Sequence, residues 1–166
     1  MELPSSVKEL QRQLNEYVFS EDQTVSFVLR AHLMMEGMLD EMIAAYLPAG
    51  DKMLARARLS FSQKLELINS FDIVDAESYN AVKALNSLRN KLAHKAMEAV
   101  QEEEVLVLLH SFGPKIYEEL LPEKENGVEH LLEYSLGVVL GLLSAELDNC
   151  LVNHSSRKSA GIKSCE

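Results

Sequence analysis

Apolar residues recur along most of the chain at spacings of three and four, the period that places them on one face of an α-helix. Clusters of Pro, Gly and Ser interrupt this period, and few helix-breaking residues occur between them. The apolar run 105–109 is short enough for a strand, but no neighbouring run could pair with it. The pattern therefore predicts an all-α helical bundle of about five to six helices. The predicted helices cover residues 6–18, 21–47, 60–71, 75–94, 102–122 and 128–153.

Polar capping residues mark where several of these helices begin. Three serines precede a Glu or Gln at the spacing of a capping box, in which each side chain bonds the other residue's backbone amide. Asp75 is a good N-cap for the helix at 75–94, and the glutamates at 102–104 suit the positive end of another helix. The capping-box pairs are Ser6 with Glu9, Ser20 with Gln23, and Ser60 with Gln63.

The connecting segments favour one folded domain with a short extension at each end. A basic linker containing Lys52, Arg56 and Arg58 follows the Pro-Ala-Gly turn at 48–50, and Gly113-Pro114 interrupts or kinks the helix at 102–122. We expect residues 1–20 to form an N-terminal helix, 21–154 to form the bundle, and 155–166 to be a disordered polar tail.

Two titratable side chains lie inside the apolar stripe of the helix at 21–47. His32 and Glu36 fall among apolar positions rather than on the polar face. We expect His32 to be a core histidine with satisfied polar atoms. An acid in such a stripe needs a partner, and Arg89 is the obvious candidate for Glu36. The apolar stripe consists of Val25, Val28, Leu29, Met35, Leu39, Met42, Ile43 and Tyr46.

The last helix is the most apolar segment of the chain. Residues 131–152 include Glu133, Glu146 and Asp148, which a membrane span would rarely tolerate, so we interpret the segment as a buried core helix. Gly137 and Gly141 have the spacing that lets another helix approach closely. That approach is either packing within the chain or a dimer contact.

Charge and cysteine content narrow the function classes. The 166 residues carry a formal net charge of −10, which repels phosphate backbones and argues against a general nucleic-acid coat protein. A local basic cleft remains compatible with that charge, because salt screens such fields over about 10 Å. Cys150 and Cys165 match no metal-ligand spacing, and no secretory signal pattern begins the chain. We therefore expect a cytoplasmic protein with reduced thiols, no membrane contact, no metal and no cofactor.

The helix at 75–94 carries the residues that could perform chemistry. Arg89 falls inside the apolar arc formed by Val82, Leu85, Leu88 and Leu92, so it must be paired, reach solvent along its stem, or line a cleft or interface. Asn90 and His94 share a neighbouring face of the same helix. A histidine can move a proton and an arginine can neutralise a developing phosphorane, which together suit RNA cleavage without a metal.

A structural interpretation of the same residues stays open. Arg89 could form a salt bridge with Glu36, Asn90 could bond the helix end, and His94 could compensate the helix dipole. Arg89 and His94 are five residues apart, which places them on different faces of an ideal helix. Their side chains therefore converge only if the helix ends or tightens near Ala93, or if a second subunit completes the site.

The segment Leu88-Arg89-Asn90-Lys91-Leu92-Ala93-His94 resembles the R-x(4–6)-H motif of the HEPN superfamily, including the polar residue after the arginine. The resemblance covers roughly residues 24–100 and implies an up-down bundle, usually dimeric, whose active members cleave RNA without metal as toxins or phage-defence proteins. It implies that Arg89 stabilises the transition state, that His94 is the acid and base, and that Asn90 positions them. Glu36 is a supporting candidate, and an antitoxin is the implied partner protein.

The order of the helices is also similar to the mannitol operon repressor family, through the long helix at 21–47, the Lys-Leu segment at 64–65 and the helix at 75–94. This second resemblance implies a regulator or interaction protein without catalytic activity. The chain contains no helix-turn-helix with a basic recognition helix. From the sequence, a homodimeric endoribonuclease with an RNA substrate and a regulator with a protein partner both remain candidates.

Overall fold

The computed structural model describes residues 24–94 and 100–161, which form an all-α protein with seven α-helices and one 3₁₀-helix in that part of the chain. The number of helices is slightly above the five to six that the sequence predicts. The helices are α2 (Thr24–Tyr46), α3 (Gly50–Ala57), α4 (Phe61–Ser70), α5 (Ala76–His94), α6 (Glu102–His110), α7 (Gly113–Leu120), η2 (Leu121–Asn126) and α8 (Val128–Gly161). The predicted N-terminal helix at 6–18 lies outside the described residues.

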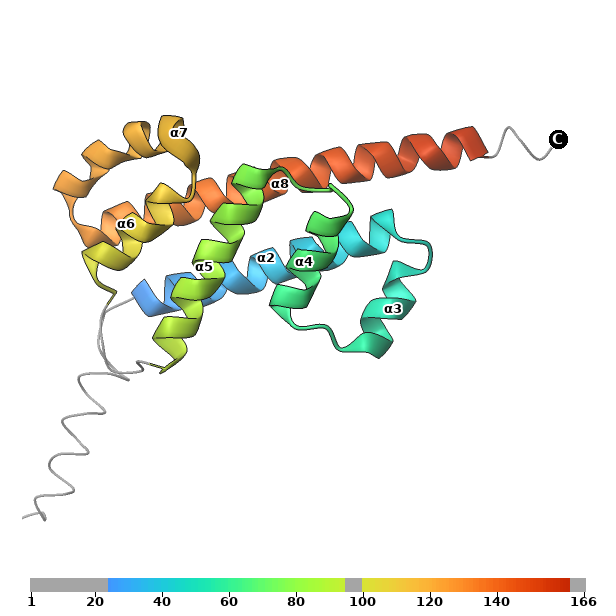
Figure 1. Ribbon diagram of the computed structural model, residues 1–166, viewed down its shortest axis with the longest axis horizontal. Coiled ribbons are helices and arrows are strands. Elements are labelled where there is room, and N and C mark those ends of the chain that lie inside the picture. The colour runs from blue at the N-terminus through green and yellow to red at the C-terminus, as the bar shows by residue number, and fades with distance from the viewer. Residues whose placement is uncertain (1–23, 95–99, 162–166) are drawn as a thin grey trace, which may run out of the picture.

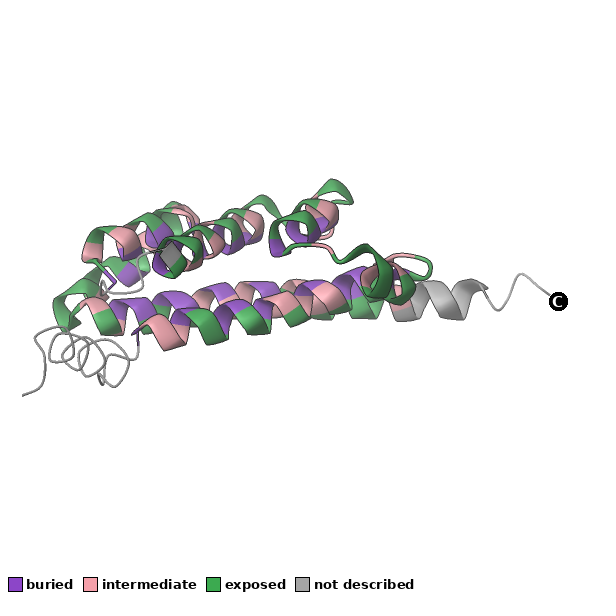
Figure 2. Ribbon diagram, turned by 90° about the horizontal axis from the view of Figure 1, so that it is seen from below, coloured by how far each residue is buried: buried purple, intermediate pink, exposed green. Residues whose placement is uncertain are grey.

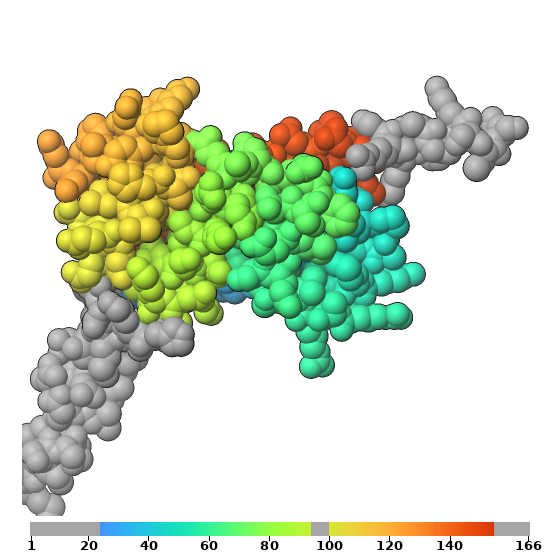
Figure 3. Space-filling model, viewed as in Figure 1, coloured from blue at the N-terminus to red at the C-terminus, as the bar shows by residue number. Residues whose placement is uncertain are grey.

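The helices form two layers, and the core lies between them. Helices α2 and α8 lie side by side and run in the same direction, and helices α4 to α7 cover one face of this pair (Figures 1 and 2). From the covered side, the helices of the second layer hide most of α2 (Figure 3). The core contains fully buried side chains from both layers, as the apolar periods require. The largest of these side chains include Met35, Leu39, Met42, Ile68, Leu85, Leu108, Phe112, Leu131 and Leu143.

The capping residues explain where α4, α5 and α6 begin. The Ser60–Gln63 capping box is present, with Gln63 N donating to Ser60 Oγ and Ser60 N donating to Gln63 Oε1. The backbone of Ser78 donates to Asp75 Oδ1 over 2.7 Å, which confirms Asp75 as a cap. Helix α6 begins at Glu102 as predicted, after a further box between Gln101 and Glu104.

The predicted basic linker after residue 50 is wrong, because helix α3 occupies most of it. Ala49 adopts a left-handed conformation, and Gly50 then brings the backbone so close to Ile43 that a Cβ atom would collide with its carbonyl oxygen. Met53 and Leu54 pack against the core from this short helix. Met53 and Leu54 are too few apolar residues to show a helical period in a sequence that is otherwise basic there.

Helix α8 extends further and is less buried than the sequence predicts. It continues to Gly161, past the point at 155 where a disordered tail was expected. By length and composition alone, the segment Val128–His154 could cross a membrane. Of the residues in its apolar 18-residue window, 28% are buried inside the protein. Leu131 and Val139 face the core, whereas Gly137 and Gly141 are exposed. The interpretation as a buried core helix therefore applies to one face of α8.

Candidate functional site

A polar cleft of about 340 Å³ lies where α2, the beginning of α4 and the second half of α5 meet. Three of the four residues that the sequence analysis assigned to a site line it or stand at its edge, namely Arg89, Asn90 and Glu36. The full lining consists of His32, Glu36, Ser60, Phe61, Ser62, Asn86, Arg89 and Asn90.

Arg89 is half-buried and belongs to the lining of this cleft. Its Nη1 atom donates to Oδ1 of the neighbouring Asn90 over 3.2 Å. The expected salt bridge between Arg89 and Glu36 is wrong, because the ion pair of Glu36 is made with Lys64 instead. Among the described residues, Arg89 takes part in no ion pair, so a positive charge without a carboxylate partner lines the cleft.

A buried lysine joins α4 to two acids of α2 beside the cleft. Lys64 Nζ lies 2.9 Å from Glu36 Oε1 and 2.7 Å from Asp40 Oδ1, and it also donates to Asp40 Oδ2. Burial opposes the charged form of Lys64, but the hydrogen bonds to Asp40 and Glu36 outweigh this effect and raise the pKa of Lys64 above 10.5. Lys64 therefore carries its positive charge at neutral pH, and its hydrogen bond to Glu36 Oε1 fixes the orientation of that carboxylate.

His32 is held in the wall of the cleft by contacts on two sides. Its Nε2 atom lies 3.0 Å from Asn86 Oδ1, and Asn86 Nδ2 donates to Ser62 Oγ over 3.2 Å. The imidazole also stacks on Phe61, with ring centroids 4.2 Å apart. Burial, and more weakly the nearby Arg89 charge, lower the pKa of His32 below 6.5, so the ring is neutral at pH 7. The prediction of a satisfied core histidine is confirmed, although this histidine also lines the cleft.

His94 is the last residue of α5, and the position of its side chain lies outside the described residues. Helix α5 is described as far as His94, and residues 95–99 lie outside the described structure, so the predicted helix end that would let Arg89 and His94 converge stays a prediction. The pairing of these two side chains stays a prediction.

Sequence reasoning missed Asn86 in the lining of the cleft, and it also missed Lys64 and Asp40 beside the cleft. A detectable signal existed for Lys64, because Phe61, Lys64, Leu65 and Ile68 have the i, i+3, i+4, i+7 spacing of one helix face. A lysine at such a position requires a nearby acid. Glu36 and Asp40 are four residues apart on α2 and could have been recognised as its partners.

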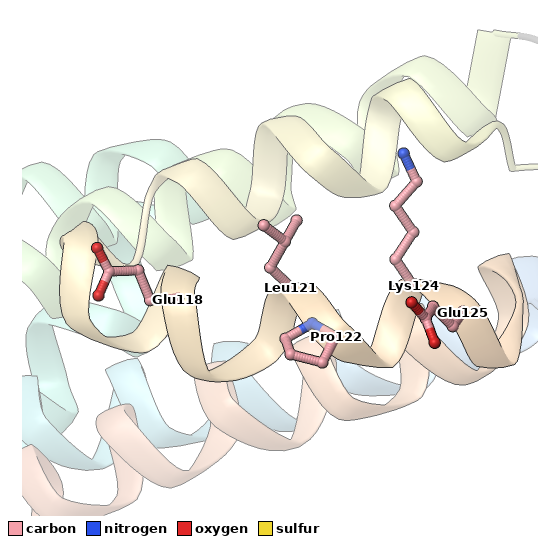
Figure 4. A pocket seen from close by; sticks show the side chains of 5 residues that line it. All are labelled: Glu118, Leu121, Pro122, Lys124 and Glu125. Atoms are coloured by element: carbon pink, nitrogen blue, oxygen red, sulfur yellow. The ribbon is translucent and has the colours of Figure 1, made fainter.

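A second hollow, of about 710 Å³, lies beside η2 and offers different chemistry (Figure 4). Its only lysine, Lys124, is paired with Glu102 over 2.6 Å, so no unpaired cation lines it in the described structure. Its other lining residues are Glu118, Leu121, Pro122 and Glu125. Across the described residues, no three His, Cys, Asp or Glu side chains gather as metal ligands would. The cleft at Arg89 is therefore the better candidate site for an anion.

Comparisons of the chain with models of protein families, with curated proteins and with solved structures find no match. The HEPN resemblance therefore rests on the residues of the motif.

Proposed function

We propose that the protein is a metal-independent endoribonuclease that binds a phosphodiester in the cleft at Arg89. The observation that carries this proposal is the half-buried Arg89, which lines a polar cleft while Lys64 pairs with the nearby Glu36. A structural arginine would be expected to bind that acid itself. An arginine without a carboxylate partner at such a site suits an oxyanion, because its planar donors match phosphate geometry.

In the proposed reaction, the 2′-oxygen of the RNA attacks the adjacent phosphorus while a base accepts the proton of the 2′-hydroxyl. The new bond from phosphorus to the 2′-oxygen replaces the bond to the 5′-oxygen, which leaves with a proton from an acid. The products are a 2′,3′-cyclic phosphate and a 5′-hydroxyl. Arg89 stabilises the charge on the phosphorane, Asn90 orients Arg89 through their hydrogen bond, and His94 is the proposed acid and base.

Glu36 has an indirect role in this proposal. Its carboxylate is bound by Lys64, so it shapes the charge of the cleft rather than accepting the substrate proton. The proposed location is the cytoplasm, where RNA and reduced thiols are found, and the proposed active form is a homodimer.

The test is cleavage of a fluorescent RNA in EDTA by the wild type, Arg89→Ala, His94→Ala and Lys91→Ala. Lys91 is an exposed neighbour on α5 that lies outside the cleft lining, so Lys91→Ala is the matched control for loss of charge. We expect Arg89→Ala and His94→Ala each to reduce the rate at least about 100-fold, and Lys91→Ala to change it little.

Equal activity in Arg89→Ala and Lys91→Ala would refute the role of Arg89. If neither the wild type nor any variant cleaves the RNA, and the protein forms a stable complex with another protein, the result would instead support the non-catalytic regulator.

A further inference from the structure

The acids and bases of this chain are unevenly distributed. Residues 52–64 contain four of the sixteen Lys and Arg residues and none of the 26 Asp and Glu residues. Residues 101–133, which include α6, α7 and η2, contain nine glutamates and two lysines, so most of the net charge of −10 lies there. In Figure 1, α5 lies between those three helices and α3. The strongest negative charge is therefore separated from the cations at 52–64.

Two of these cations have no acid that compensates them. Lys64 is bound by Glu36 and Asp40, as described above. Arg56, near the end of α3, and Arg58, directly after it, are both exposed. Within residues 24–94 and 100–161, neither arginine takes part in an ion pair. Two neighbouring arginines without nearby acids give this part of the surface a positive potential that attracts anions.

Arg56 and Arg58 lie beside the cleft that contains Arg89. Arg58 adopts a left-handed conformation with φ 47°, which ends α3 and turns the chain toward α4. Ser60 lines the cleft, so its Cα atom is at most about 7 Å from that of Arg58, two residues earlier. The end of α3, the beginning of α4 and the end of α5 lie along the same lower edge in Figure 1, and Figure 2 looks onto this edge from below. We define the basic edge by Arg56, Arg58 and Arg89.

The basic edge has the chemistry of a path for a phosphate backbone. It contains three of the six arginines in the chain, and a guanidinium group binds phosphate through two parallel hydrogen bonds. One phosphodiester in the cleft reaches Arg89 alone. In a longer strand the neighbouring phosphates lie outside the cleft, where Arg56 and Arg58 are exposed. The charges of RNA repeat along its backbone, so one strand can contact the cleft and both exposed arginines whatever its base sequence.

We propose that Arg56 and Arg58 bind backbone phosphates of the RNA strand where it leaves the cleft on the side of α3. This inference rests on the proposed function, because the phosphodiester at Arg89 determines where the neighbouring phosphates lie. The connection between α3 and α4 thus contributes to affinity and not to the chemical step. It also explains how a chain with a net charge of −10 binds a polyanion, since its acids are concentrated beyond α5.

The test is binding of a fluorescent 2′-O-methyl RNA of about 12 nucleotides, measured by fluorescence anisotropy. This RNA lacks the attacking 2′-hydroxyl, so binding is measured whether or not the protein cleaves RNA. The test variant is Arg56→Gln/Arg58→Gln. Lys83→Gln/Lys115→Gln is the matched control, because it removes the same charge from exposed lysines of α5 and α7 that lie outside the basic edge. Far-UV circular dichroism checks that both variants fold.

The salt dependence counts the phosphate contacts that are lost. Each contact with a single strand contributes about 0.7 to the slope of log affinity against log salt concentration, so the test variant should lower this slope by about 1.4 between about 50 and 200 mM salt. At about 0.1 M salt, the same loss corresponds to binding about 25-fold weaker. The control should bind almost as the wild type does. Equal affinities and slopes in the two double variants, or no binding by the wild type, would overturn the proposal.

The cleavage assay in EDTA separates this inference from the proposed function. Arg56→Gln/Arg58→Gln should raise KM at least about tenfold and leave kcat nearly unchanged, because neither arginine lines the cleft. Cleavage with an unchanged KM would overturn the inference and leave the ribonuclease intact. Salt-dependent binding through these arginines, without cleavage by the wild type, would keep the inference and refute the ribonuclease.

A competition experiment distinguishes RNA from an acidic protein partner. A glutamate peptide with the same number of charges as the RNA is added to the complex of the wild type with the 2′-O-methyl RNA. We expect the peptide to displace the RNA at least about tenfold less effectively than unlabelled RNA does, because carboxylates do not reproduce the geometry of the phosphate backbone. Equal displacement would overturn the proposed path and favour an acidic protein as the occupant of the basic edge.

Discussion

Replacing Lys64 with methionine tests the ion cluster that positions Glu36. The substitution keeps the apolar stem of the side chain but leaves Glu36 and Asp40, four residues apart on α2, without their shared cation. Removing one partner of a buried ion pair costs about 3–5 kcal/mol. Here the two carboxylates have side chains 33% and 39% exposed, so water screens the charges that remain. We therefore expect the free energy of unfolding to fall by about 2–3 kcal/mol.

Urea denaturation at pH 7, followed by far-UV circular dichroism, measures this loss. For a urea slope of about 2 kcal/mol per M, the expected loss corresponds to a midpoint about 1–1.5 M lower. Lys83→Met is the matched control, because Lys83 is an exposed lysine on α5 and its loss should leave the urea midpoint nearly unchanged.

A triple variant separates charge from packing. Lys64→Met combined with Glu36→Gln and Asp40→Asn removes all three charges, and it should recover most of the lost stability, because no uncompensated charge remains. If Lys64→Met alone is as stable as the wild type, or if the triple variant is no more stable than Lys64→Met, the cluster does not hold α4 to α2 by charge.

Two further predictions concern the wall and the rim of the cleft. Because the pKa of His32 in the folded protein lies below its unfolded value of about 6.5, the unfolded chain binds more protons in that range, and stability should fall as the pH drops below about 6.5. Urea denaturation between about pH 8 and pH 5 should show a shallower acid-side loss in His32→Gln than in the wild type, and parallel pH profiles would contradict this. Ser60→Ala removes the acceptor for Gln63 N and should lower the free energy of unfolding by about 1 kcal/mol. Ser70→Ala, at the other end of α4, is its comparison, and equal losses in the two variants would argue against the capping box.

Much of the fold followed from local signals. The caps at Ser60 and Asp75 bond the first turn of their own helices, so they act within a few residues and can be recognised in the sequence. The period of Val82, Leu85, Leu88 and Leu92 correctly gave the buried face of α5. Helix α3 was missed because its apolar residues are few, and its conformation depends on the close packing of Gly50 against α2.

The sequence by itself determined which residues share a helix face, since the α-helical period is a property of the local backbone. It therefore placed Arg89 inside an apolar arc and identified Glu36 as an acid that requires a partner. Only the tertiary structure determined that the partner is Lys64 rather than Arg89, and that His32 and Asn86 complete the cleft. These contacts join residues 28 and 54 positions apart. They depend on how each helix is rotated and placed against the others, which the packing of the whole core determines.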